Sequence, residues 1–222
     1  MRRTFAAFSL AMCGALGLSE ALAQSIPPPW AIGVLAGGTS ASLSGDSPAS
    51  TKFHGQRGFS AAAFLELRLA PEVSISVQPG FTRRQTGIAF EIPGEDEPRD
   101  SLSVRLDYFN VPILIKIFSG NGRTYVAGGL DVGWSLSSTM TGAGAPVDLG
   151  DTMRDLDLGG VFAFGVTFPI GAPRLVTELR YVQSIINAST GDGSADTVGP
   201  VRFRSRGFQL TLGITFPLGR TP

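Results

Sequence analysis

The stretch GFQLTLGITFPL, from Gly207 to Leu218, alternates between apolar and polar side chains almost without interruption. Successive side chains of a β-strand point to opposite faces of its sheet, so this stretch predicts a strand with one apolar face. That pattern fits a soluble β-sandwich and a membrane β-barrel equally well. The apolar face consists of Phe208, Leu210, Leu212, Ile214, Phe216 and Leu218.

The beginning of the chain favours the membrane alternative, because residues 1–23 have the features of an export signal. A positive start at Arg2 and Arg3 precedes an apolar run from Phe5 to Leu18 and small residues at Ala21 to Ala23. We therefore expect cleavage after residue 23 and a single domain formed by residues 24–222.

Composition narrows the alternatives further. The 18 basic and 18 acidic residues balance, so no global field favours binding to nucleic acid. The 29 glycines disfavour long helices, since each costs about 1 kcal/mol relative to alanine. Cys13, the only cysteine, lies inside the predicted signal. Lipidation at Cys13 is the less favoured alternative, because Met12 is too large for the position before a lipidated cysteine.

Eight strand-like segments and their connections set the expected topology. The connections alternate between long and short, as in bacterial barrels with external loops on one rim and periplasmic turns on the other. We therefore expect an all-β fold: a single closed antiparallel up-and-down transmembrane β-barrel in the cell outer membrane. The segments are Trp30–Gly38, Gly58–Leu69, Val73–Arg84, Leu102–Ile117, Arg123–Ser138, Asp155–Phe168, Arg174–Asn187 and Ser205–Leu218. The long loops are Thr39–Arg57, Gln85–Ser101, Thr139–Arg154 and Ala188–Arg204; the short turns are Ala70–Glu72, Ser119–Gly122 and Pro169–Pro173.

Charged residues in the middle of the strands predict a polar interior. A charge on the lipid face costs about 2–4 kcal/mol at the bilayer midplane, so such residues should point into the bore and pair there. The alternative is an exposed sheet face with ordinary surface ion pairs. The expected lumenal charge network comprises Glu66, Arg68, Arg105, Asp107, Asp131, Asp157, Glu178 and Arg180.

The fourth segment does not keep one phase. Arg105 and Asp107 share their parity with the apolar Phe109 and its successors, which predicts a β-bulge near Tyr108. Pro112 in the same segment argues against a simple ladder there.

Several stretches resemble one known family, the outer-membrane β-barrel domain of PorT-like proteins. LDYFNVPILIKI (Leu106–Ile117) matches that family's Tyr-x-x-hydrophobic-Pro-hydrophobic run. The resemblance extends over YVAGGLDVGWSLSS (Tyr125–Ser138), LVTELRYVQSIIN (Leu175–Asn187) and RGFQLTLGITF (Arg206–Phe216). It implies a small barrel, and its motifs are strand patterns without a catalytic signature. The chain continues beyond the terminal aromatic Phe216, where many members of that family end.

Catalysis on the barrel rim requires a histidine held on a strand beside a serine. The only histidine, His54, falls in the predicted first long loop, where a histidine is more often incidental than catalytic. We therefore expect no catalytic residue and no cofactor.

Acidic residues in two other predicted loops are the remaining metal candidates. Glu95–Glu97 and Asp100 could hold Ca²⁺ through oxygen ligands, but Arg99 lies among them and no recognised ligand spacing appears. A solvated loop is the favoured interpretation here and at Asp192 and Asp196, so no metal site is expected.

Two functions of different classes remain open. One is a closed barrel with a structural or surface-interaction role; the other is a narrow pore for water or small solutes. A lipid-acting rim enzyme is a weaker third. The expected partners are outer-membrane lipid and lipopolysaccharide, the barrel-assembly machinery during biogenesis, and an unknown ligand at the long loops, without nucleic acid.

The terminal strand provides a test of face assignment. Leu212→Arg would place a charge at lipid depth and should sharply reduce heat-modifiable protein in the outer membrane. Thr211→Arg would point into the bore and should be milder. Equal loss, or the reverse order, would mean that the faces are wrongly assigned.

Overall fold

The computed structural model describes residues 29–45, 51–90, 99–142, 145–150, 154–186 and 203–219. The predicted signal peptide lies outside these residues, as does almost all of the predicted loop Ala188–Arg204. No helix in the described part of the chain is long and apolar enough to cross a membrane. The strands are β1 (Trp30–Gly45), β2 (Thr51–Ala70), β3 (Val73–Val77), β4 (Gly80–Phe90), β5 (Arg99–Phe118), β6 (Thr124–Thr141), β7 (Val147–Asp148), β8 (Leu156–Pro169), β9 (Arg174–Ser184) and β10 (Phe203–Leu218).

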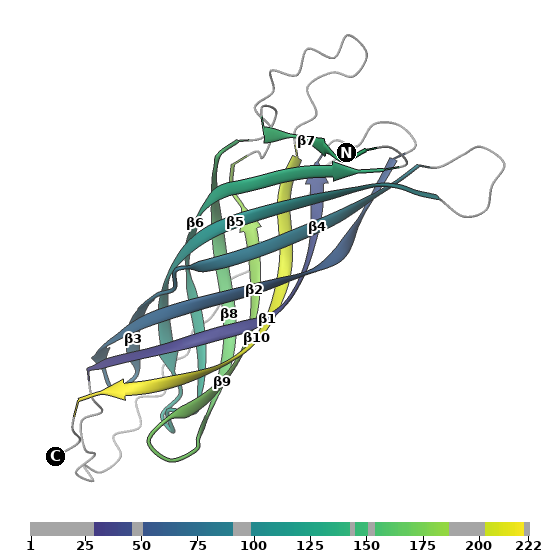
Figure 1. The fold of residues 1–222 in the computed structure, drawn as a ribbon. Helices are drawn as coiled ribbons and strands as arrows, with labels where there is room; N and C mark the ends of the chain where they lie inside the picture. The colour runs from purple at the N-terminus through teal and green to yellow at the C-terminus, as the bar shows by residue number, and fades with distance from the viewer. Residues whose placement is uncertain are drawn as a thin grey trace, which may run out of the picture.

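Backbone hydrogen bonds connect these strands in an unbroken antiparallel ring (Figure 1). The ring runs β1, β2, β4, β5, β6, β8, β9, β10 and back to β1. Strands β3 and β4 follow one another between β2 and β5, and β7 adds two residues beside β6. The strands therefore occupy eight positions, and the expected antiparallel eight-stranded barrel is confirmed.

The two ends of the barrel differ. Turns at 71–72, 119–123 and 170–173 lie at one end, together with the paired residues Trp30 and Leu218. We call this the short-turn end and the opposite rim the long-loop end.

Strands reach further toward the long-loop end than the hydropathy pattern predicted. Only residues 46–50 separate β1 from β2, so most of the predicted loop Thr39–Arg57 is strand and His54 lies on β2. Likewise β4 continues to Phe90, β5 starts at Arg99, and β6 continues to Thr141. Backbone pairing does not require apolar side chains, so the ladders continue where the alternation of hydropathy has faded.

The side chains alternate between an apolar outer surface and a mostly polar interior. On β10, Leu212 is 59% exposed whereas Thr211 is 4% exposed. On β5, Ile113 and Ile115 are about half exposed, and Leu114 between them is fully buried. Large apolar side chains therefore cover the outside, as expected for a wall that faces lipid.

The irregularity predicted near Tyr108 is present, but its extra residue lies on the neighbouring strand. Asp107 pairs with Ser137 and Tyr108 with Ser135, which leaves Leu136 of β6 as the additional residue. Strand β5 consequently keeps one phase along its length. Pro112 lies opposite the interruption between β3 and β4, and its carbonyl accepts a hydrogen bond of 2.9 Å from the backbone N–H of Gln78.

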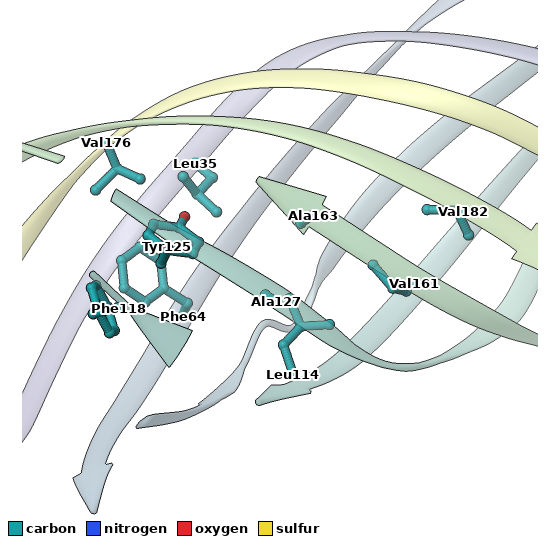
Figure 2. Packing of buried hydrophobic residues seen from close by; sticks show 10 residues of the cluster. All are labelled: Leu35, Phe64, Leu114, Phe118, Tyr125, Ala127, Val161, Ala163, Val176 and Val182. Atoms are coloured by element: carbon teal, nitrogen blue, oxygen red, sulfur yellow. The ribbon is translucent and has the colours of Figure 1, made fainter. Parts of the chain in front are cut away.

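Aromatic and aliphatic side chains fill part of the interior (Figure 2). The rings of Phe118 and Tyr125 lie 5.2 Å apart between their centroids, with Phe64 close by. A glycine makes room for Tyr125: a Cβ on Gly165 would lie 2.1 Å from the Cζ atom of its ring. The cluster comprises Leu35, Phe64, Leu114, Phe118, Tyr125, Ala127, Val161, Ala163, Val176 and Val182.

Substitution at this glycine should therefore be costly. Gly165→Ala would displace the Tyr125 ring, and we expect a loss of about 1–3 kcal/mol in unfolding free energy in detergent. Gly160→Ala on the same strand is the matched control, because a Cβ there meets nothing within 4 Å. Urea titration of both variants measures the difference. Equal stability of the two would show that the ring does not depend on the glycine.

Candidate functional site: the polar bore

Four cationic and four anionic side chains form ion pairs in the described part of the bore. A buried charge is costly unless a partner compensates it, so the pairing of these groups decides whether the interior is stable. The cations are Arg68, Arg84, Lys116 and Arg180, and the anions are Glu66, Asp131, Asp157 and Glu178.

Arg84 of β4 joins two carboxylates across the bore. Its guanidinium donates to Asp157 Oδ2 at 2.9 Å on β8 and to Asp131 Oδ2 at 3.4 Å on β6. Asn110 Nδ2 also donates to Asp131 Oδ2 at 2.9 Å, and Ser184 Oγ donates to Asp157 Oδ2 at 2.9 Å. One arginine thus connects three walls of the barrel.

Glu178 is the centre of a second group and is fully buried. Arg180 on the same strand donates to Glu178 Oε1, with an Nε to Oε1 distance of 3.0 Å, and also to Gln78 Oε1. Tyr125 donates its hydroxyl to Glu178 Oε2 at 2.7 Å. Strands β6 and β9 meet at this carboxylate, and Arg180 connects it to Gln78, which follows β3.

A third group lies toward the short-turn end. Lys116 Nζ donates to Glu66 Oε2 at 2.8 Å and stands 5.1 Å and 4.9 Å from the ring centroids of Phe64 and Tyr125. Arg68 lies 3.8 Å from Glu66 Oε1. The ammonium group is therefore held by one carboxylate and two aromatic faces, which suits a buried cation.

Two small cavities lie among these groups in the described part of the bore. A cavity of about 20 Å³ borders Gln78, Asn110 and Arg180, and one of about 50 Å³ borders Glu66, Arg68 and Lys116. A single water needs roughly 10–15 Å³ on the same measure, so each cavity holds a few waters at most. The paired charges and the apolar cluster together narrow the bore.

Six of the eight residues predicted for the lumen point into it: Glu66, Arg68, Asp131, Asp157, Glu178 and Arg180. The prediction is wrong for Arg105 and Asp107, which lie on the outer face. Asp107 pairs there with Arg83, whose guanidinium lies over the outward-facing ring of Phe59. The physical reason is that β5 keeps one phase from Ser103 to Ile117, so its odd-numbered residues face outward there.

Sequence reasoning missed Arg84 and Lys116, although parity held a signal for both. Arg84 shares its parity with Ser74, Ser76, Gln78 and Thr82, which form the polar face of their segment. Lys116 has the opposite parity to Phe109 and Ile115, so it belonged to the polar face even with the expected bulge near Tyr108.

The other residues considered as catalytic or metal-binding candidates are not brought together into a site by the described part of the structure. His54 lies on β2 opposite Gly87 rather than in a loop. Among the described residues, no group of three or more His, Cys, Asp or Glu is placed to hold a metal ion. Glu95–Glu97, Asp192 and Asp196 lie outside the described residues, as does the side chain of Asp100.

A closed antiparallel ring with an apolar outside and a charged bore is the architecture of an outer-membrane β-barrel. The sequence matches the outer membrane protein beta-barrel domain family over residues 22–190, so the chain belongs to this family and is an outer-membrane protein. A search of curated proteins found no match.

Solved structures with a similar fold include Neisserial surface protein A, OprG from Pseudomonas aeruginosa, and AlkL. Neisserial surface protein A is 14% identical, with 85% of this chain and 99% of that chain covered and a TM-score of 0.48. OprG is 11% identical, with 86% and 98% covered and a TM-score of 0.47. AlkL is 12% identical, with 100% and 99% covered and a TM-score of 0.49. At such identities the similarity concerns the fold and not a ligand or activity.

The central position of Arg84 leads to a stability prediction. Arg84→Met would strand Asp131 and Asp157, and we expect a loss of about 3–5 kcal/mol in unfolding free energy in detergent. Arg105→Met is the control: its side chain is 42% exposed on the outer face, so the loss should stay below about 1 kcal/mol. Equal losses would contradict the assignment of Arg84 to the bore and Arg105 to the surface.

Proposed function

We propose that this protein acts as a closed outer-membrane barrel with a structural or surface-interaction role and without catalysis. The observation that carries the proposal is the occlusion of the bore by compensated charges, from Arg84 with its two aspartates to Lys116 with Glu66. An eight-stranded barrel is only wide enough for its own side chains to fill. A bore crossed by such pairs lacks the open lumen of a diffusion channel.

The orientation that goes with this role places the long-loop end outside the cell and the short turns in the periplasm. Removal of residues 1–23 as an export signal and insertion by the barrel-assembly machinery of a Gram-negative cell complete the proposed route. Within the family, the strand motifs around Leu106–Ile117 support a closer affiliation with PorT-like barrels. The contact surface would then be the long-loop end, with an as yet unidentified ligand.

A narrow pore for water or small solutes is the second candidate. It is favoured by three acceptor atoms in the bore, the Oδ1 atoms of Asn110, Asp131 and Asp157, which accept no hydrogen bond from the described protein atoms. Such atoms could exchange hydrogen bonds with passing water. The charged pairs beside them oppose the passage of ions.

Conductance separates the two candidates. The refolded protein in planar bilayers should show no large steady conductance, whereas a general diffusion porin in the same bilayers provides the positive control. Heat-modifiable gel mobility confirms that the inserted protein is folded. Steady, large single-channel steps from the unmodified protein would reject the closed-barrel proposal.

Topology is tested separately on intact cells. Added protease should cleave only within the connections of the long-loop end, at 46–50, 91–98, 143–153 or 187–202, because only these face outside in the proposed orientation. Permeabilised cells provide the control for access to the short turns. Cleavage confined to 71–72, 119–123 or 170–173 in intact cells would reverse the topology.

A further inference from the structure

Arg105 and Asp107, which the sequence analysis placed in the bore, form a cluster with Arg83 on the outer face of β4 and β5. Arg83 donates two hydrogen bonds to Asp107, Nε to Oδ1 at 2.7 Å and Nη2 to Oδ2 at 2.8 Å. Arg105 Nε lies 3.8 Å from the same Oδ2. The arginine side chains stay 30% and 42% exposed, whereas the Asp107 side chain is 9% exposed. The carboxylate is therefore covered, and the guanidinium groups face the surroundings.

Arg57 brings a third guanidinium to the neighbouring strand. Strand β2 carries one extra residue between Gln56 and Ser60 opposite β4. At this bulge Gly58 packs directly on the carbonyl of Arg83, where an added Cβ would lie 2.0 Å from the oxygen. The exposed Arg57 directly precedes this glycine and therefore lies on the outer face of the strand next to Arg83. Arg57, Arg83 and Arg105 thus lie on three adjacent strands near Asp107. Asp148 of β7 lies on the far side of Arg105, because it pairs with Thr139, which pairs with Arg105, so these residues carry a surplus of one positive charge.

Aromatic side chains place this cluster relative to the membrane. The next outward-facing residues toward the short-turn end are aromatic. Phe81 of β4, Phe109 of β5 and Trp134 of β6 lie opposite one another on these neighbouring strands. Phe59 of β2 stacks against Phe81 at 5.3 Å, and Arg83 lies over both rings. Aromatic rings of this kind mark the boundary between hydrocarbon and headgroups.

The length of the apolar wall agrees with that boundary. Outward residues of β5 from Phe109 to Ile117 are uncharged. At a tilt of about 40° they cover roughly 23 Å along the barrel axis, close to the apolar band of about 25 Å in outer-membrane barrels. The arginine cluster therefore lies directly above the hydrocarbon, at the level of lipid phosphates on the long-loop side.

We propose that Arg57, Arg83 and Arg105 bind a phosphate group of a phosphorylated lipid in the outer leaflet, such as lipopolysaccharide. Guanidinium groups suit phosphate because their N–H donors form paired, charge-assisted hydrogen bonds with its oxygens. Asp107 and the two phenylalanine rings hold Arg83 in position, while Arg57 and Arg105 supply the most exposed donors. This inference rests on outer-membrane placement and the proposed orientation, and is independent of whether the bore conducts.

Lipid retention by the refolded full-length mature protein tests the inference. In phosphatidylcholine nanodiscs, native mass spectrometry would compare binding of diphosphorylated lipid A with that of the dephosphorylated form. The double variant Arg57→Gln/Arg105→Gln should bind the phosphorylated form about fivefold more weakly and the dephosphorylated form unchanged. Arg123→Gln, an exposed arginine in a short turn, is the matched control and should behave as the unmodified protein. Heat-modifiable mobility verifies folding of each variant.

A second variant has an expected effect of opposite sign. Asp107→Asn removes the competing carboxylate, so binding of the phosphorylated lipid should strengthen about threefold and weaken again with added salt. If the Arg83–Asp107 pair were only structural, this variant would lose stability without gaining affinity. Unchanged binding in the double variant, equal loss for both forms of lipid A, or full displacement by millimolar inorganic phosphate would each overturn the proposal. The topology assay on the same preparations reports separately whether the cluster faces the outer leaflet.

Discussion

The lack of water in the hydrocarbon core determines the rest of this structure. Every backbone N–H and C=O at that depth needs a protein partner, because an unsatisfied group costs several kcal/mol. The chain meets this requirement by pairing its last strand with its first, from Trp30 opposite Leu218 to Gly45 opposite Phe203. Once the ring is closed, the strand period of two divides the side chains between lipid and bore.

The small diameter of the ring then constrains the interior. Side chains from all walls meet near the axis, so polar groups must satisfy one another there. Arg84 does this by joining carboxylates from β6 and β8, and Glu178 by accepting from Arg180 and Tyr125. The Tyr125 ring fits only because Gly165 presents no Cβ at that point. Tyr125 therefore contributes both to the packing of the interior and to the compensation of the Glu178 charge.

How far the sequence predicts this structure depends on the local register. Alternating hydropathy and alternating loop lengths were sufficient to predict the ring of strands. The same alternation of side chains predicted that six charged residues point into the bore. Periodicity could not show that the extra residue near Tyr108 is Leu136, because a bulge on either strand produces the same local mismatch. The error on Arg105 and Asp107 follows from that ambiguity. Strand ends were also missed, since beyond the membrane neither face needs to be apolar.

The length of the strands explains why charges occur on an outward face at all. Strands β2 and β5 contain 20 residues each, which span about 50 Å along the axis at a tilt of about 40°. The apolar band accounts for only about 25 Å of this length, so much of the wall extends past the lipid tails. An arginine on the lipid face costs about 2–4 kcal/mol at the midplane but only about 0–1 kcal/mol near the interface. The pairing of Arg83 with Asp107 just beyond Phe81 and Phe109 therefore costs little free energy where it lies. The same pair would be destabilising closer to the bilayer midplane. The outer surface of the extended wall, and not the loops alone, thus becomes available for contact with the headgroups around the barrel.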